Sequence, residues 1–417
     1  MLKRELDSHF ERKLDSYLDL LKQMVDINSF TANADGVNRL GELTIACFSD
    51  LGFSSRRYPS RNPSFGDHIV LSKAADSGTE RPNIALVSHL DTVFPLDEEK
   101  RNQFSWRVEG DKIFGPGTVD IKGGTVLMFM VLDGLREINP VLFHGVNWYI
   151  LLNAAEETLE AEFGELCRKQ IPKSALACLV FEGGRRNNDR YSIVTARKGM
   201  ATYRIMVEGK AAHAGSAHQS GSNAIVKLAQ VVTAIAKMTD YDRQLTFNVG
   251  TVAGGTVINR VPHMAVASGE MRAFESDILN AGIADLKALE DIGPGLSRNG
   301  EFPSQVHIEI INRWRPWSPN RKTNILLSLW SESASDMGWE VVAEERGGLS
   351  DANQVWDHVP TLDGLGPSGG NAHCSERNAD RSKEQEYVLI SSFIPKAILN
   401  TRAINSLIEG NGEKRAE

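Results

Sequence analysis

Side chains of the types that bind divalent metal ions are spread widely along this chain. The candidates are His89, Asp120, Glu157, Glu182 and His373. His89 closes the apolar run NIALVSH, and Glu182 directly follows the run SALACLVF. In an open α/β sheet, ligands collect outside the carboxyl ends of the strands, so we expect the fold to bring these residues into one crevice.

The chemistry of this set indicates which ions it would hold and how many. Two imidazoles and three carboxylates suit Zn²⁺, with Mn²⁺ or Co²⁺ as alternatives. Five ligands are more than one tetrahedral ion needs, whereas two ions that share one bridging carboxylate would use all of them. The set therefore predicts two divalent ions per chain.

Two short motifs contain the first two of these residues. In SHLDTVFP, Asp91 follows His89 by two positions, which lets its carboxylate accept the second ring N–H of His89 and orient the ring. In GPGTVDIKGG, glycines permit a tight backbone just before the predicted helix TVLMFMVLDGL. An Asp in that place is more often a helix cap than a ligand. Together with the first motif, however, it is better interpreted as the ligand Asp120.

A third motif is the adjacent pair Glu156 and Glu157, which follows the run VNWYILLNAA. Neighbouring side chains of an extended chain point to different sides, so one can bind metal while the other faces the substrate. Metal-assisted hydrolysis needs such a base, to take a proton from water and pass it to the leaving nitrogen. The segment EETLEAEFGE would also suit a solvated acidic loop, but its position directly after a buried strand favours the functional interpretation.

The elements that must position these residues form a layered pattern. Alternating helical and strand patterns in the first half predict an α/β domain. The expected helices are 4–27, 36–52 and 121–137, and the expected strands are 67–73, 83–89, 146–153 and 175–182. After about residue 319 the same alternation resumes, with a helix at 322–337, strands at 339–345 and 360–364 and a C-terminal helix at 384–408.

Between these two parts the pattern changes to β-α-β-β-α-β, the ferredoxin-like order. Its expected elements are strand 200–208, helix 221–238, strands 245–253 and 263–273, helix 275–291 and strand 304–312. Because His373 follows this small domain, the domain must be inserted into the metal-binding one. We therefore expect a catalytic domain formed by residues 1–197 and 313–417, with residues 198–312 as the insertion.

Composition excludes several classes of protein. A chain of 417 residues with 41% hydrophobic content can bury a large core, and its net charge of −8 argues against nucleic-acid binding. No stretch reaches the roughly 20 apolar residues of a membrane span, and the N-terminus lacks the apolar core of a signal peptide, so we expect a cytoplasmic protein. Without CxxC spacing, the cysteines are expected to be reduced; they are Cys47, Cys167, Cys178 and Cys374.

Taken together, the motifs resemble those of the dinuclear zinc metallopeptidases that include glutamate carboxypeptidase, acetylornithine deacetylase, succinyl-diaminopimelate desuccinylase and related aminoacylases. The resemblance covers nearly the whole chain, because that family also has an inserted ferredoxin-like lid and dimerisation domain. It implies a catalytic domain with a central mixed sheet flanked by helices. It implies these roles: His89 and Glu182 bind one zinc, Glu157 and His373 bind the other, Asp120 bridges them, Asp91 orients His89, and Glu156 is the general base and acid.

The resemblance also assigns residues of the lid. His213 in GKAAHAG would cross the interface of a homodimer and help to polarise the scissile carbonyl in the other subunit. Asn259 and Arg272 match substrate-binding positions, and an Arg fork suits a free α-carboxylate. By themselves, a loop histidine and a strand-end arginine are more often structural or solvated, so these three roles depend on the resemblance.

Three functions are left open by the sequence. The layout is closest to the glutamate carboxypeptidase branch, which implies release of a C-terminal amino acid, with glutamate favoured, from a peptide or an N-acyl conjugate. A deacylase or desuccinylase of a small N-acyl amino acid would use the same metals and base. A non-catalytic binding protein with this fold is disfavoured, because every ligand and the base are present.

Overall fold

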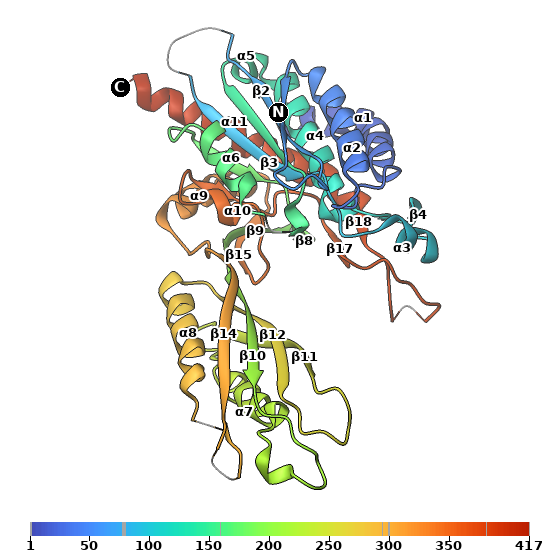
Figure 1. The fold of residues 1–417 in the computed structure, drawn as a ribbon. Coiled ribbons are helices and arrows are strands. Elements are labelled where there is room, and N and C mark those ends of the chain that lie inside the picture. The colour runs from blue at the N-terminus through green and yellow to red at the C-terminus, as the bar shows by residue number, and fades with distance from the viewer. Residues whose placement is uncertain are drawn as a thin grey trace. The chain divides into compact units, whose positions relative to one another are not determined.

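The computed structural model describes residues 2–76, 81–158, 160–293, 295–298, 301–380 and 382–416. They form two compact units (Figure 1). The larger unit comprises Met1–Thr195, Asn320–Glu345 and Ser350–Glu417, and the smaller one comprises Ala196–Pro319 and Arg346–Leu349. Among the helices of the described ranges, none is both long enough and apolar enough to cross a membrane.

The larger unit is built on a six-stranded mixed sheet, as expected from the sequence. Its strand order is β1 (Ser54–Pro59), β2 (Asp67–Lys73), β6 (Asn147–Asn153), β3 (Asn83–His89), β7 (Ala177–Val180) and β16 (Thr361–Leu362). The last four of these are parallel to one another, while β2 is antiparallel to both of its neighbours, β1 and β6. Parallel strands covered on both faces read as continuous apolar runs, and β3 and β7 are buried along almost their whole length.

Helices cover this sheet. The longer ones are α1 (Leu2–Val25), α2 (Ala34–Ser49), α4 (Gly123–Ile138), α6 (Glu162–Gln170), α9 (Arg321–Ser335) and α11 (Phe393–Ala416). Short helices are α3 (Leu96–Arg101), α5 (Pro140–His144) and α10 (Ala352–Val355). The helix α4 contacts β3, α1 and α11, and its sequence is apolar on nearly every face because nearly every face is buried.

One buried carboxylate fastens α1 to α4. Asp133 of α4 is almost fully buried, and its Oδ2 atom lies 2.9 Å from His9 Nε2 and 2.5 Å from both Lys13 Nζ and Tyr17 Oη. Arg136 Nη2 donates to the other oxygen at 2.9 Å. Burial would raise the pKa of Asp133, but the hydrogen bonds from His9, Lys13 and Tyr17 outweigh it, and the pKa lies below its ordinary value.

Two small sheets complete the larger unit. One has the order β17 (Gly369–Gly370), β18 (Tyr387–Leu389), β5 (Lys112–Phe114) and β4 (Arg107–Glu109), and the other has β15 (Glu340–Arg346), β9 (Arg190–Arg197) and β8 (Arg185–Asn187). The last residues of β9 and β15, from Ala196 and at Arg346, belong to the smaller unit. The helix predicted for 384–408 was therefore wrong in its first part. The aromatic and β-branched residues of β18 pair with strands on both sides. The helix α11 begins only at Phe393; Pro395 lies in its first turn, where the N–H that proline lacks would have no partner within the helix.

The smaller unit has the ferredoxin-like arrangement expected from its element order. An antiparallel sheet runs β11 (Thr246–Gly254), β12 (Met264–Ala273), β10 (Gly199–Glu208), β14 (Pro303–Trp314) and β13 (Gly295–Leu296). The helices α7 (Ala224–Ala236) and α8 (Ser276–Ala288) contact its strands and form a core with them. The predicted insertion, 198–312, lies within this unit.

A four-residue segment distant in sequence also belongs to the smaller unit. Arg346–Leu349 is held there by backbone carbonyls: Arg197 Nη1 donates to Gly348 at 3.1 Å and to Leu349 at 3.2 Å, and Arg272 Nη1 donates to Gly347 at 2.9 Å. The amide of Lys198 adds a bond of 3.0 Å to the carbonyl of Arg346. Local sequence patterns gave no indication of this segment's placement.

Candidate metal centre

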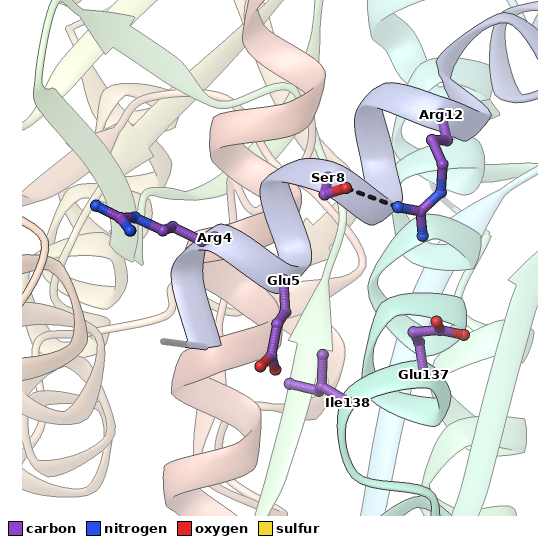
Figure 2. Close-up of a pocket in the computed structure, with 6 residues that line it drawn as sticks. All are labelled: Arg4, Glu5, Ser8, Arg12, Glu137 and Ile138. Atoms are coloured by element: carbon purple, nitrogen blue, oxygen red, sulfur yellow. Dashed lines mark hydrogen bonds between the residues drawn. The ribbon is translucent and has the colours of Figure 1, made fainter.

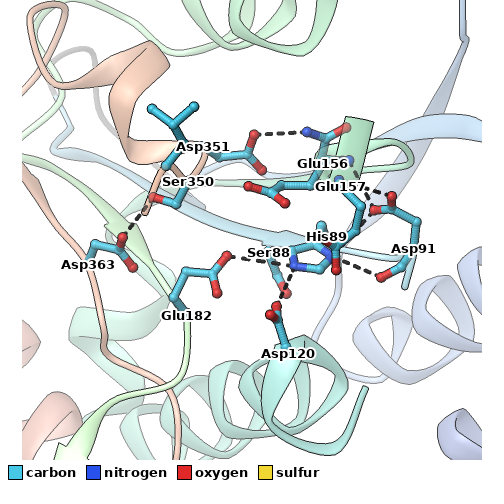
Figure 3. A network of polar contacts seen from close by, with 12 residues as sticks. Ser88, His89, Asp91, Asp120, Glu156, Glu157, Glu182, Ser350, Asp351 and Asp363 are labelled. Carbon is cyan, nitrogen blue, oxygen red and sulfur yellow. Dashed lines mark hydrogen bonds and ion pairs between the residues drawn. The ribbon is translucent and has the colours of Figure 1, made fainter. Parts of the chain in front are cut away.

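Three adjacent parallel strands position the first candidate ligands. β3 ends at His89, and β6 ends at Asn153, the residue paired with His89 in the register. The chain then enters a turn, Glu156–Thr158, that carries the Glu pair, while Glu182 lies two residues beyond the end of β7. The carboxyl ends of these strands meet at one edge of the sheet, and Figure 3 shows their polar side chains converging there.

Asp120 and His373 reach the same place from loops. Asp120 lies in Thr118–Lys122, directly before α4, and its two oxygens face different histidines: Oδ1 is 3.1 Å from His89 Nε2, and Oδ2 is 3.3 Å from His373 Nε2. Glu182 Oε1 lies 3.7 Å from His89 Nε2, and Glu157 Oε2 lies 3.2 Å from His373 Nε2. All five predicted ligands are therefore brought together.

Their potential ligand atoms form three overlapping groups, and within each group the atoms lie within 4.8 Å of one another. One group is His89, Asp120 and Glu182, a second is Asp120, Glu157 and His373, and a third is His89, Glu156 and Glu157. The first two groups contain all five predicted ligands and share Asp120. Glu157 Oε1 is buried with no hydrogen-bond partner in the described structure, as expected of an oxygen that completes its contacts with a cation. Imidazole and carboxylate donors in this number fit Zn²⁺, Co²⁺ or Mn²⁺.

The buried Asp91 holds the turn of the Glu pair and the His89 ring in place. Its Oδ1 accepts the amide N–H of Glu156 at 3.0 Å, and its Oδ2 accepts the amide of Glu157 at 3.2 Å and the hydroxyl of Thr31 at 2.7 Å. His89 Nδ1 lies 3.0 Å from the Asp91 carbonyl oxygen and 3.4 Å from Oδ1. Since both are acceptors, Nδ1 carries a hydrogen and Nε2 is the nitrogen that faces the ligand cluster.

Burial and neighbouring charges shift the pKa values of the groups in the cluster. Burial would lower the pKa of His89, but hydrogen bonds with Asp120 and Asp91 hold it well above its usual range. Hydrogen bonds with Asp120 and Glu157 raise the pKa of His373 to about 11. Burial raises the pKa of both Glu156 and Glu157. Without ions the two histidines therefore hold protons that bound cations would displace.

Asp351 also belongs to this region and was not singled out by sequence reasoning. Asn153 Nδ2 donates to its Oδ1 at 2.8 Å, while Oδ2 is buried with no partner in the described structure. Burial raises the pKa of Asp351 to about 7. Figure 3 shows its carboxyl group beside that of Glu156, whose pKa it helps to raise. The stretch GGLSDAN carried the residue, but no spacing rule linked it to the Glu pair.

The smaller unit carries the other predicted residues at two separate places. His213 and Asn259 are exposed on neighbouring segments, where the amide of Ala214 donates to the carbonyl of Asn259 at 3.0 Å. The amides of Gly215 and Ser216 both donate to His213 Nδ1 at 3.1 Å. His213 Nδ1 is therefore an acceptor, which places the ring hydrogen of the neutral form on Nε2.

Arg272 is engaged within its own unit. Its Nε and Nη2 donate to the two oxygens of Glu270 at 2.9 Å and 3.0 Å, and its Nη1 donates to Gly347. These contacts use three of the five guanidinium N–H groups, so one N–H remains on each terminal nitrogen. Arg272 is thus oriented by Glu270 and keeps donors for a second acceptor.

A cavity outside the centre contains none of the predicted residues. It lies between α1 and the end of α4 and has a volume of about 650 Å³ (Figure 2). Its walls combine Arg4 and Arg12 with Glu5 and Glu137, so charges of both signs line it. The cluster at the ends of β3, β6 and β7 therefore remains the candidate site.

Comparisons with known proteins show which families this chain resembles. Residues 195–289 match the model of the peptidase dimerisation domain. The chain is 29% identical over 402 residues to carboxypeptidase G2 of Pseudomonas sp. (strain RS-16), covering 94% of this chain and 89% of that protein. It is 25% identical over 280 residues to acetylornithine deacetylase of Buchnera aphidicola subsp. Acyrthosiphon pisum (strain Tuc7), covering 63% and 68%.

A solved structure shares the fold. The aminopeptidase PepT of Bacillus cereus superimposes with a TM-score of 0.73 at 20% identity, over 94% of this chain and 98% of that one. The expected resemblance and fold are thereby confirmed.

Proposed function

We propose a specific activity from the premise that this chain is a metal-dependent amide hydrolase, homologous to carboxypeptidase G2 and the acetylornithine deacetylases. The proposed reaction is release of a C-terminal amino acid, with glutamate favoured, from a peptide or N-acyl conjugate. The observation that carries it is the pair of ligand groups that share Asp120 and lie beside Glu156. Two zinc ions, or cobalt or manganese in their place, are the proposed cofactors.

In this proposal the two groups that share Asp120 hold the ions, and Glu156 is left as the base. His89 and Glu182 would hold one ion, Glu157 and His373 the other, and Asp120 both. When bound, the ions would lower the pKa of the attacking water and polarise the scissile carbonyl. Asp91 keeps the His89 ring and the turn of the Glu pair in place through the bonds described above.

Glu156 is the proposed general base and acid. Its carboxylate would take a proton from the attacking water and deliver it to the leaving nitrogen. Burial raises the pKa of Glu156 well above its usual value, which favours the protonated form that can return the proton to the leaving group. The hydrogen bond that its amide N–H donates to Asp91 Oδ1 fixes the backbone from which this side chain projects.

A homodimer is the proposed working form. Arg272 and Met264 lie eight residues apart on β12. Next to Met264, the carbonyl of His263 accepts the amide N–H of Gly209, in the segment that leads to His213. The separation of Arg272 and Met264 is about 26 Å along a strand. One small substrate cannot touch both ends, so His213 and Asn259 are proposed to act in the partner subunit's site. There, His213 Nε2–H would donate to the developing oxyanion.

The surface suited to such a dimer is an edge of the smaller unit. β11 is the last strand of its sheet, and Val252 on it is 61% exposed. Val226 of α7 and Val257 are 57% and 58% exposed. An exposed strand edge with aliphatic side chains is a template for pairing with a second chain. Sedimentation of the purified protein tests this, with a monomer at all concentrations as the contrary result.

The substrate assignment is tested by a panel. Dipeptides and N-acyl glutamates with a free α-carboxylate should be hydrolysed by the zinc- or cobalt-loaded protein, and amidated analogues should be poor substrates. Faster turnover of N-acetylornithine or N-succinyl-diaminopimelate would favour the deacylase alternative, which the acetylornithine deacetylase homologues support. A cytoplasmic location also stays a prediction, to be tested by cell fractionation.

A further inference from the structure

The two loops that deliver Asp120 and His373 leave the same small sheet. β18 is an inner strand of that sheet and pairs with β5 on one side and β17 on the other. In the register, Tyr387 lies opposite both Phe114, the last residue of β5, and Gly370, the last residue of β17. The chain continues from β5 to Asp120 and from β17 to His373. Both ligand loops therefore begin beside the start of β18.

The residue just before that start, Glu386, bonds to both loops. Its side chain is almost completely buried, and one oxygen, Oε1, accepts the amide N–H of Val119 at 3.0 Å and that of Asp120 at 3.2 Å. Its own amide donates to the carbonyl of Cys374, the neighbour of His373, at 2.7 Å. Its carbonyl accepts the amide of Gly115 at 3.4 Å.

The preceding residue, Gln385, also bonds to the His373 loop. Gln385 is fully buried, and its Nε2 donates to the carbonyl of Ser375 at 2.9 Å and to that of Asn102 at 3.0 Å. The His373 loop is therefore bonded to consecutive residues of one segment. His373 itself has a φ of 66°, a left-handed conformation that a non-glycine residue holds only where its surroundings fix it.

From these contacts we propose that Glu386 is a positioning residue of the metal centre, which sets the spacing between Asp120 and His373. This inference rests on the ligand assignment proposed above and adds a residue that touches neither ion nor substrate. Glu157 is positioned differently, by the hydrogen bond that its amide N–H donates to Asp91 Oδ2. The His373 group therefore has two ligands, Asp120 and His373, on loops bonded to Glu386, while the group of His89 and Glu182 has only Asp120 on such a loop.

Loss of the Glu386 side chain should weaken the binding of one ion more than that of the other. Replacing Glu386 with Ala removes the acceptor of the amides of Val119 and Asp120 but keeps the main-chain bond to Cys374, so the Asp120 loop can then shift relative to the His373 loop. Loss of a residue that orients metal ligands typically weakens metal binding by about ten- to a hundredfold. We expect that loss for the ion of the His373 group, with the other ion held more nearly as in the wild type. Glu386→Gln keeps a carbonyl oxygen at the same position and should retain both ions.

The experiment is titration of ion-free full-length protein with Co²⁺, followed by calorimetry and elemental analysis. Wild type and Glu386→Gln should take up two ions with similar affinities, and Glu386→Ala should show one site weakened about ten- to a hundredfold. A Glu386→Ala protein with two sites of wild-type affinity would overturn the inference. So would a Glu386→Gln protein as impaired as the Ala variant, because the proposal needs only the acceptor oxygen.

Two further variants separate this inference from its premises. Asp133→Ala removes another buried carboxylate, the one that joins α1 to α4 away from the ligands; it should lower the melting temperature and leave both sites intact. If it weakens one site as Glu386→Ala does, the effect is general destabilisation and the inference fails. Asp120→Ala should impair both sites; if it does not, the proposed ligand assignment fails instead.

Discussion

The sharpest consequence of the structure concerns Asp91, which contacts neither the ions nor the substrate in this account. Replacing it with Ala removes one carboxylate that accepts three hydrogen bonds, from the amides of Glu156 and Glu157 and from the Thr31 hydroxyl. It also removes the carboxylate oxygen 3.4 Å from His89 Nδ1. A bond to a charged group contributes about 1.5–3 kcal/mol, and buried amides left unpaired add a desolvation cost.

These contributions are not additive, because one carboxylate makes all of them. We therefore expect Asp91→Ala to lower the free energy of unfolding of the ion-free protein by about 3–5 kcal/mol, as loss of one partner from a buried charged network does. Ion affinity should fall by about ten- to a hundredfold, because the His89 ring and the Glu pair both lose their support. Turnover should fall with them, since the base shares that support.

Urea unfolding and Co²⁺ titration measure the two effects separately. Thr31→Val is the matched control: it removes one donor to the same carboxylate and should cost about 1 kcal/mol of stability, with ion binding nearly unchanged. The reasoning is refuted if Asp91→Ala loses stability but binds ions and turns over substrate as the wild type does. It is equally refuted if Thr31→Val weakens ion binding as much as Asp91→Ala.

Three further predictions concern pH, assembly and recognition. In ion-free protein the pKa of His373 is raised to about 11, so the stability it contributes is complete below its unfolded pKa near 6.5 and is lost as the pH rises towards 11. Ion binding displaces that proton, so affinity should rise with pH in calorimetry; a pH-independent affinity from 6 to 9 would contradict this. Mixing inactive His213→Ala with inactive Glu156→Gln should restore some activity where subunits exchange, and no recovery would mean that His213 does not act across subunits. Arg272→Ala should cost about 2–5 kcal/mol in kcat/KM on substrates with a free carboxylate and much less on their amides; equal losses would show that Arg272 only holds Glu270 and Gly347.

Where the sequence predicted the site well, local pattern and chemistry agreed. The strands that end near His89, Glu157 and Glu182 are apolar runs buried on both faces, so their ends could be located to within a few residues. The β-α-β-β-α-β order likewise follows from clear periodicities. The roles given to these residues stay predictions, although the distances agree with them.

The rest depended on contacts between segments far apart in the chain. β18 has only three residues, and its flank KEQEYV resembles a helix by composition, so neither the strand nor Glu386 could be recognised. Asp351 was missed because its partner, Asn153, lies 198 residues away. The placement of Arg346–Leu349 depends on the guanidinium of Arg197, which donates to the carbonyls of Gly348 and Leu349. No sequence pattern encodes such contacts.

The central claim is that Glu156 moves the proton in a centre whose ions are held by other residues. Glu156→Gln preserves size and shape but cannot accept a proton, so the direct measurement is its kcat together with its ion content. The account predicts a fall in kcat of at least about a hundredfold with two ions still bound per chain. A variant that loses an ion but keeps wild-type turnover at full loading would contradict the account and exchange the roles of Glu156 and Glu157.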